Sequence, residues 1–149
     1  MKDFTRLFDI IYYQKANFEQ PDAFACKTNG EWKQYSTQDI IDGANKVSRA
    51  LLKLGVKPDD KISIVSNNRP EWNMVDLGIL QIGAVNVPVY PTISEGEYKF
   101  IFKDAEIKYV CVSDRNLFAE IANIRSEIPT LKEIFSIEKV DGCKHFNDF

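Results

Sequence analysis

Glycines are the first residues to consider for chemistry, because closely spaced glycines let backbone N–H groups approach a phosphate. The seven glycines stand at positions 30, 43, 55, 78, 83, 96 and 142, and no two are closer than five positions. The patterns GxGxxG and GxxxxGK[ST] are therefore both absent. A phosphate could still meet the start of a helix near Pro70, after the segment 66–69. Capping of that helix by Asn67 or Asn68 is the simpler interpretation, because Asn is favoured just before a helix.

Nucleophilic and metal-assisted chemistry have little support in the residue types. The single histidine, His145, lies near the end of the chain, so a Ser/His/Asp triad has no evident base. Cys26, Cys111 and Cys143 lack the close spacing of zinc ligands. Two of them, Cys26 and Cys111, fall in apolar, strand-like runs, where a free cysteine behaves as a small hydrophobic side chain. We expect inert thiols in a reducing compartment and no metal site.

Two pairs of acidic residues could in principle exchange protons with a substrate. Asp59-Asp60 falls in a turn before a strand, and Glu95 with Glu97 falls in the first turn of an expected helix. Acidic side chains interact favourably with the dipole at the start of a helix, and such pairs are common on surfaces. We interpret both pairs as surface residues and not as acid–base catalysts.

The overall composition excludes several classes of protein. The chain is 44% hydrophobic and 28% charged, as soluble globular domains are. Its net charge is −3, with no run of basic residues and interleaved aromatics, so no nucleic-acid partner is expected. The first six residues carry charges where a signal peptide needs an apolar core, and no apolar stretch approaches the roughly 18 residues that span a bilayer. We expect a cytoplasmic protein, and peripheral association with the inner face of the membrane stays open.

The elements that would position these residues begin with a helix and a hairpin. Apolar residues recur at helical spacing at the start of the chain: Phe4, Leu7, Phe8 and Ile11. Two β-prone runs, 23–27 and 31–35, then flank Thr28-Asn29-Gly30. Asn-Gly between such runs is the strongest short-range signal of a hairpin.

Helices and strands alternate through the rest of the chain. The motifs Ser36-x-x-Asp39 and Ser94-x-x-Glu97 resemble capping boxes, and Asp114 is placed to cap a further helix. Short apolar runs predict strands at 61–66, 84–89, 108–112 and 133–137, and the tail 141–149 has no periodicity. This order indicates an α/β fold: a mostly parallel sheet with flanking helices and an N-terminal β-hairpin. Such sheets bind ligands at the carboxyl ends of their strands.

Two phrases of the sequence carry a resemblance to a known family. The segment 66–72 reads SNNRPEW, and the segment 83–92 reads GAVNVPVYPT. Together with the early block YSTQDI at 35–40, they resemble the adenylate-forming (AMP-binding) superfamily and, within it, the long-chain fatty-acid–CoA ligases, or acyl-CoA synthetases. The resemblance covers nearly the whole chain and is most specific over 66–92.

The resemblance implies a two-step ligase that uses ATP, Mg²⁺ and coenzyme A. A fatty-acid carboxylate attacks the α-phosphate of ATP to give an acyl-adenylate and pyrophosphate, and the thiol of coenzyme A then displaces AMP. The family's Gly-rich loop ending in Lys and its later nucleotide motifs are absent from residues 1–149. We therefore expect an incomplete N-terminal portion of the AMP-binding domain, without catalytic, cofactor-binding or metal residues, that binds no cofactor and is inactive by itself.

Residues Tyr90 and Thr92 are the only candidate substrate-adjacent positions, because the resemblance places the segment 84–92 near the wall of the substrate-binding half. Pro88 and Pro91 restrict the backbone there to extended conformations. Some relatives bind the phosphate of coenzyme A with arginines after a later strand. Only Arg115 is nearby in this sequence, and the local pattern differs, so that role is not transferred.

Two alternatives stay open. The chain could belong to an adenylation domain that acts on another carboxylic acid, or it could be a complete small α/β binding module. The codons after Phe149 discriminate between them, since a Gly-rich loop ending in Lys supports the ligase and a stop codon supports the module. We also expect the truncated chain to leave a helix face or a sheet edge uncovered and to self-associate through it.

Overall fold

The computed structural model describes residues 5–28 and 30–146, so Phe4 of the opening helix and Asn29 of the expected hairpin turn lie outside the described residues. The chain forms two compact units. One contains residues 1–55 and 68–82 and is called the helical unit here. The other contains residues 56–67 and 83–149 and is called the sheet unit.

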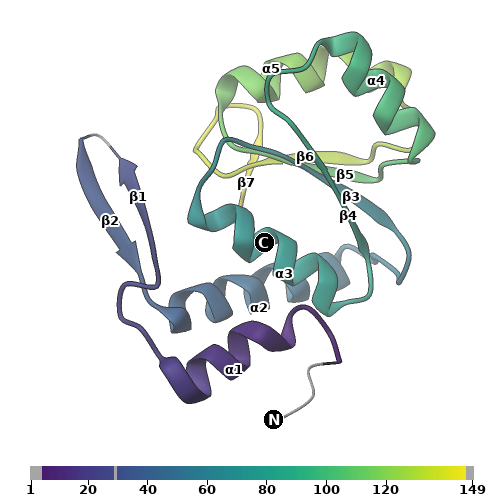
Figure 1. Ribbon diagram of the computed structural model, residues 1–149. Helices are drawn as coiled ribbons and strands as arrows, with labels where there is room; N and C mark the ends of the chain where they lie inside the picture. Colours follow the sequence, from purple (N-terminus) through teal and green to yellow (C-terminus); the bar gives the residue numbers. More distant parts are fainter. Residues whose placement is uncertain (1–4, 29, 147–149) are drawn as a thin grey trace. The chain divides into compact units, whose positions relative to one another are not determined.

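In its described residues, the helical unit has three helices and a hairpin (Figure 1). In chain order these are α1 (Asp9–Phe18), β1 (Phe24–Thr28), β2 (Glu31–Tyr35), α2 (Thr37–Lys53) and α3 (Pro70–Gln81). The expected hairpin is confirmed, with β1 and β2 antiparallel and Thr28 opposite Glu31. The first helix begins later than its pattern predicted, at Asp9, and Leu7 is 70% exposed.

Helix α2 is fixed at its start by a local signal and along its length by α3. The Ser36 side chain accepts a hydrogen bond from the Asp39 N–H, and the Asp39 carboxylate accepts one from the Ser36 N–H, which confirms the capping box. A Cβ atom built on Gly78 of α3 would lie 2.6 Å from Cβ of Val47 and 2.9 Å from the carbonyl oxygen of Ala44. The two helices therefore approach closely because position 78 has no side chain.

The sheet unit is a five-stranded parallel sheet in the order β4-β3-β5-β6-β7. Its strands are β3 (Lys61–Val65), β4 (Val85–Val89), β5 (Tyr109–Val112), β6 (Glu133–Ser136) and β7 (Lys144–His145). Strand β7 is an addition to the expected set, because a two-residue strand has no detectable periodicity. Pro88 lies in β4, an edge strand, where a missing N–H is tolerated.

Helices α4 (Glu95–Asp104) and α5 (Arg115–Ile124), with the 3₁₀ turn Arg125–Glu127, cover one face of this sheet (Figure 1). The core between them is apolar and includes Tyr98, Phe102, Val110, Ile121 and Ile134, each at most 1% exposed. The expected caps are present, since Ser94 forms a capping box with Glu97 and the Asp114 carboxylate accepts bonds from the start of α5. The predicted fold class is thus confirmed. Within the described residues, no helix is both long and apolar enough to cross a membrane.

Candidate functional site

The carboxyl ends of the parallel strands bring a row of hydroxyl groups together. The register aligns Val65 with Val112, so Ser66 and Ser113 follow neighbouring strands at the same edge of the sheet. The backbone N–H of Asn67 donates to Oγ of Ser113 at 3.4 Å, and Oγ of Ser66 donates to the carbonyl of Asn67 at 2.7 Å. Both serines are buried, with exposed fractions of 7% and 2%. This row stiffens the edge at which α/β proteins bind ligands.

Helices α4 and α5 both begin at this edge, and each start is closed by its own side chains. Oδ1 of Asp114 accepts hydrogen bonds from the N–H groups of Asn116 and Leu117 at 3.0 and 3.2 Å. Oγ of Ser94 accepts one from the N–H of Glu97 at 3.4 Å. A phosphate at a helix N-terminus needs free N–H donors, and the caps use one of them at α4 and two at α5. The carboxylates of Glu97 and Asp114 also place negative charge at these starts, which disfavours an anion there.

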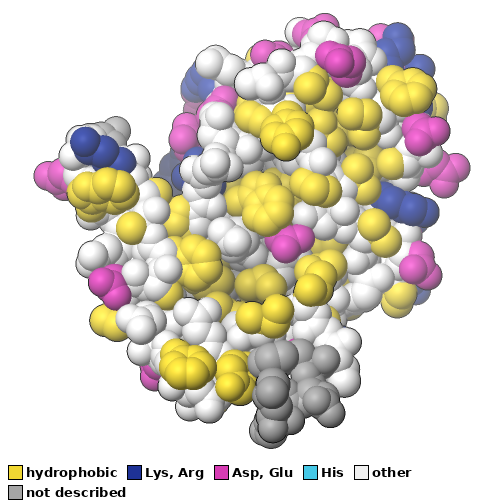
Figure 2. All heavy atoms as spheres, in the orientation of Figure 1, with side chains coloured by type: hydrophobic (Ala, Val, Ile, Leu, Met, Phe, Trp, Pro, Cys, Tyr) yellow, Lys and Arg dark blue, Asp and Glu magenta, His cyan; other side chains and the backbone are white. Residues whose placement is uncertain are grey.

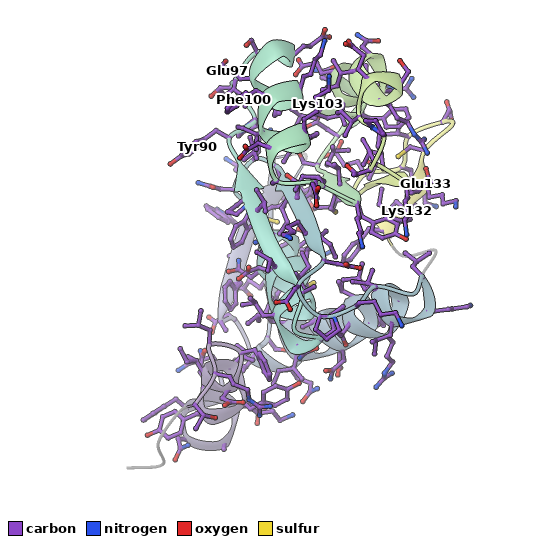
Figure 3. The ribbon with its side chains drawn as sticks, turned by 90° about the vertical axis from the view of Figure 1, so that its right-hand side faces the viewer. Tyr90, Glu97, Phe100, Lys103, Lys132 and Glu133 are labelled. Atoms are coloured by element: carbon purple, nitrogen blue, oxygen red, sulfur yellow. The ribbon has the colours of Figure 1, made fainter. Side chains whose placement is uncertain are left out.

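The two candidate substrate-adjacent residues lie in the turn between β4 and α4. Tyr90 is 80% exposed, and its carbonyl accepts a hydrogen bond from the hydroxyl of the fully buried Tyr98 at 3.0 Å. Thr92 is exposed as well. Figure 3 shows Tyr90 pointing away from the ribbon near Glu97 and Phe100 of α4. Among the hydrogen bonds of the described residues, none joins Tyr90 or Thr92 to the Ser66–Ser113 row.

The opposite end of the sheet carries charge pairs with a structural role. Figure 3 shows Lys132 and Glu133 at the start of β6, away from Tyr90. Oε1 of Glu133 lies 3.2 Å from a guanidinium nitrogen of Arg125, and Oε2 lies 2.9 Å from Nζ of Lys144. Burial raises the pKa of the Glu133 carboxyl, but its hydrogen bond to Lys144 and the nearby charges lower that pKa below its ordinary value. These contacts join β6 to its neighbours.

Nucleophilic groups are present in the sheet unit, but the structure does not activate them. The register places His145 beside Ser136. Oγ of Ser136 is fully buried and has no hydrogen-bond partner among the described residues, so His145 does not deprotonate it. Burial raises the pKa of the Cys143 thiol to about 11, which keeps it protonated at neutral pH. The described residues also contain no cluster of three His, Cys, Asp or Glu side chains that could hold a metal ion.

Arg115, whose role was not transferred from relatives, is the first residue of α5. Its guanidinium lies 3.4 Å from the carboxylate of Asp141, and both side chains are largely exposed. An exposed pair of this kind contributes little to stability.

The helical unit contains a polar cluster that sequence reasoning missed. The hydroxyl of Tyr35 donates to Oε1 of Glu71 at 2.7 Å, and Nε of Arg69 donates to Oε2 of Glu71 at 3.0 Å. Burial raises the pKa of Glu71, but the two hydrogen bonds outweigh it and hold that pKa below its ordinary value. Burial raises the pKa of the Tyr35 hydroxyl, and the hydrogen bond to Glu71 adds to the rise. The cluster ties the end of β2 to the start of α3.

The start of α3 differs from the expected cap at Asn67 or Asn68 and disfavours a phosphate near Pro70. Arg69 occupies the N-cap position and makes no side-chain cap, so neither Asn67 nor Asn68 caps the helix as expected. Pro70 follows directly, and its fixed φ starts the helix without a cap. The ionised Glu71 lies in the first turn, where its charge repels a phosphate. A phosphate near Pro70 is therefore disfavoured.

A shallow hollow of about 410 Å³ opens beside this cluster. It is lined by Phe24 and Ala25 of β1, by Asn68 and Arg69, and by the first turn of α3. The only sequence signal that could have located the region is that YSTQDI and SNNRPEW contain Tyr35 and Glu71, whose side chains meet across 36 positions.

The chain belongs to the AMP-binding enzyme family, whose model matches residues 13–146. It is 28% identical over 109 residues to the long-chain-fatty-acid–CoA ligase FadD15 of Mycobacterium bovis, covering 73% of this chain and 18% of that protein. It is 32% identical over 118 residues to a medium/long-chain-fatty-acid–CoA/3-oxocholest-4-en-26-oate–CoA ligase of Mycolicibacterium smegmatis, covering 79% and 21%. The chain therefore spans about a fifth of the length of these relatives.

A solved structure shows the same fold. The anthranilate CoA ligase AuaEII in complex with anthranoyl-AMP superposes with a TM-score of 0.82 at 23% identity, over 99% of this chain and 27% of that one. The resemblance drawn from SNNRPEW and GAVNVPVYPT is thus confirmed at the level of the family.

The residues of this chain do not fit Mg·ATP by themselves. The helix starts at the sheet edge are closed by Ser94 and Asp114, the start of α3 carries Glu71, and the described residues hold no carboxylate cluster for a divalent ion.

Proposed function

We propose that the chain supplies part of the scaffold of an ATP-dependent long-chain fatty-acid–CoA ligase. The observation that carries the proposal is the match of residues 13–146 to the AMP-binding family, joined to fatty-acid–CoA ligases at 28–32% identity. The reaction joins a fatty acid to coenzyme A through an acyl-adenylate and releases AMP and pyrophosphate. ATP, Mg²⁺ and coenzyme A are the cofactors of that whole enzyme.

In this proposal the chain contributes rigid geometry and not reacting groups. The hydroxyl row at Ser66 and Ser113 fixes one edge of the sheet, and Tyr98 fixes the turn that presents Tyr90 and Thr92. The groups that bind the triphosphate lie outside the 149 residues, so the isolated chain forms no acyl-adenylate. The turn at 90–92 lies beside the substrate of the whole enzyme.

Thioester formation by the product of the whole reading frame tests this function. The product is purified and incubated with ATP, Mg²⁺ and coenzyme A, with palmitate in one arm and anthranilate in another. Palmitoyl-CoA as the preferred product supports the proposal. Preference for the aromatic acid supports an adenylating enzyme for another carboxylic acid, and a stop codon after Phe149 supports a small binding module; either outcome overturns the fatty-acid assignment.

A further inference from the structure

The β1–β2 hairpin has two open edges. In the described part of the chain it forms a sheet of only two strands, and an isolated two-stranded sheet is marginally stable in water. Along each open edge, every second residue turns its N–H and C=O groups away from the partner strand. Such an edge readily pairs with a further strand. The hairpin therefore offers an edge to which an additional strand can bind.

Strand β2 also exposes a large aromatic side chain. Trp32 is 71% exposed, and its neighbours Glu31, Lys33 and Gln34 are exposed too. Figure 2 shows hydrophobic side chains beside basic and acidic ones over this hairpin. Tryptophan is enriched at the centres of protein interfaces, where it contributes most of the binding energy when it becomes buried. The exposure of Trp32 does not identify the binding partner, but the order of the residues in β2 does.

The sequence of β2 is complementary to itself in the antiparallel direction. When two copies pair about a twofold axis through Trp32, Trp32 lies opposite Trp32 of the second copy. Glu31 then lies opposite Lys33 of the second copy, and Lys33 lies opposite Glu31. Aromatic pairs and opposite charges are the cross-strand pairs that stabilise antiparallel sheets.

Other axes lack this complementarity. An axis through Lys33 would place two ammonium groups opposite each other, which destabilises a strand pair. On β1, an axis through Cys26 would place Ala25 opposite Lys27, with no charge or aromatic partner. The choice of strand and of register therefore follows from charge.

We propose that this chain forms a homodimer in which the β2 strands of two copies pair antiparallel about Trp32. The two hairpins then make a four-stranded sheet in the order β1-β2-β2-β1. Lys27 lies opposite Trp32 within each hairpin, so a lysine flanks each indole on the same face of the sheet. This surface goes beyond the proposed ligase function and does not depend on it.

One existing contact changes when the dimer forms. Nζ of Lys33 lies 4.6 Å from the centre of the Tyr35 ring, and it must turn toward Glu31 of the second copy. Lys33 is exposed although Tyr35 is buried, and two new opposite-charge pairs replace the two cation–π contacts. The exchange therefore does not oppose dimerisation strongly.

Sedimentation velocity of the 149-residue chain over a wide concentration range tests the proposal. The wild-type chain is expected to shift from monomer to dimer as its concentration rises. Trp32→Ala is expected to weaken the dimer about tenfold or more, because the central aromatic pair is lost. Leu52→Ala, at a residue of α2 that is 57% exposed, is the matched control and leaves the dimer unchanged.

Charge reversal separates this register from any other. Glu31→Lys and Lys33→Glu each place like charges opposite each other twice and weaken the dimer, while the double variant restores both pairs and the wild-type affinity. Asp22→Lys, at an exposed residue, changes the net charge as Glu31→Lys does and controls for that change. Circular dichroism confirms that every variant is folded. A wild-type chain that stays monomeric at its highest soluble concentration, or a dimer that Trp32→Ala and the single reversals leave intact, overturns the proposal.

Discussion

Glu71 has an environment that its sequence neighbours do not predict. It is a partly buried carboxylate that accepts hydrogen bonds from both Tyr35 and Arg69, and its side chain is 14% exposed. A buried carboxylate without partners would be neutral, and these two donors keep it charged. The interaction therefore contributes to stability through the ionised form.

This gives a pH-dependent prediction for Glu71→Gln. The pKa of Glu71 in the folded chain lies below its ordinary value of 4.5, so its contribution is fully present above pH 4.5 and is lost as the pH falls through the lower, folded value. The substitution is expected to cost about 1–3 kcal/mol at pH 7 and less in acid. Urea unfolding at a series of pH values measures the difference. Glu19→Gln, in an exposed pair 3.9 Å from Lys15, serves as control; an equal loss at pH 7 and pH 3 for Glu71→Gln would falsify the assignment.

Tyr90 and Thr92 support a prediction about binding. In the proposed ligase, Tyr90→Ala and Thr92→Ala are expected to raise the KM of a substrate severalfold with little change in kcat, because the proposal places these two side chains against the substrate without a reacting role. Leu52→Ala on α2 is the matched control, since Leu52 is 57% exposed and lies on a helix of the helical unit. Steady-state kinetics measures the two constants. Unchanged KM values in both variants would show that Tyr90 and Thr92 do not contact the substrate.

At the scale of elements, the packing of α2 on α3 depends on one glycine. Alanine favours a helix over glycine by about 1 kcal/mol, so propensity alone predicts that Gly78→Ala stabilises the chain. The new Cβ would lie 2.6 Å from Cβ of Val47 and 2.9 Å from a backbone oxygen, and backbone cannot move aside cheaply. We expect a net loss of about 1–3 kcal/mol.

Gly43→Ala is the matched comparison. Its Cβ would meet the side chain of Met74, which is flexible and can adopt another rotamer. We expect a smaller loss than for Gly78→Ala, as measured by chemical denaturation of both variants. Equal stabilities of the two variants would show that the helices do not approach as closely as the structure places them.

Local signals predicted most of the elements, and contacts distant in sequence explain what they missed. The capping boxes at Ser36 and Ser94 span three residues each, so the sequence carries them completely. The Tyr35–Glu71 hydrogen bond spans 36 positions, and the local pattern of apolar residues cannot predict it. Strand β7 is defined by its pairing with β6 alone, and its two residues carry no pattern of their own in the sequence.

The predicted cap of α3 is wrong for a different reason. Asn at 67 and 68 is a favourable cap, but Pro70 already fixes the first helical residue, and the cap position falls on Arg69. The candidate site was only partly predictable. The carboxyl edge of the sheet follows from the strand order, whereas the Ser66–Ser113 row depends on β3 and β5 being neighbours.

At the scale of the whole molecule, the family of the chain is established. We propose that the chain supplies scaffold and that residues outside it bind the phosphates. The chain matches the AMP-binding family over residues 13–146 and spans about a fifth of its relatives. The starts of α4 and α5 are capped by their own side chains, and the buried Ser136 hydroxyl and the Cys143 thiol are not activated. These features suit a scaffold that holds a substrate wall and leaves phosphate chemistry to other residues.

ATP–pyrophosphate exchange driven by palmitate tests directly whether the 149 residues catalyse adenylation by themselves. The assay is run on the isolated 149-residue chain and on the product of the whole reading frame, under the same conditions. The account predicts palmitate-dependent exchange by the whole product and none by the isolated chain. Exchange by the isolated chain would contradict the account. A whole product that shows no exchange with palmitate or any other fatty acid would contradict it as well.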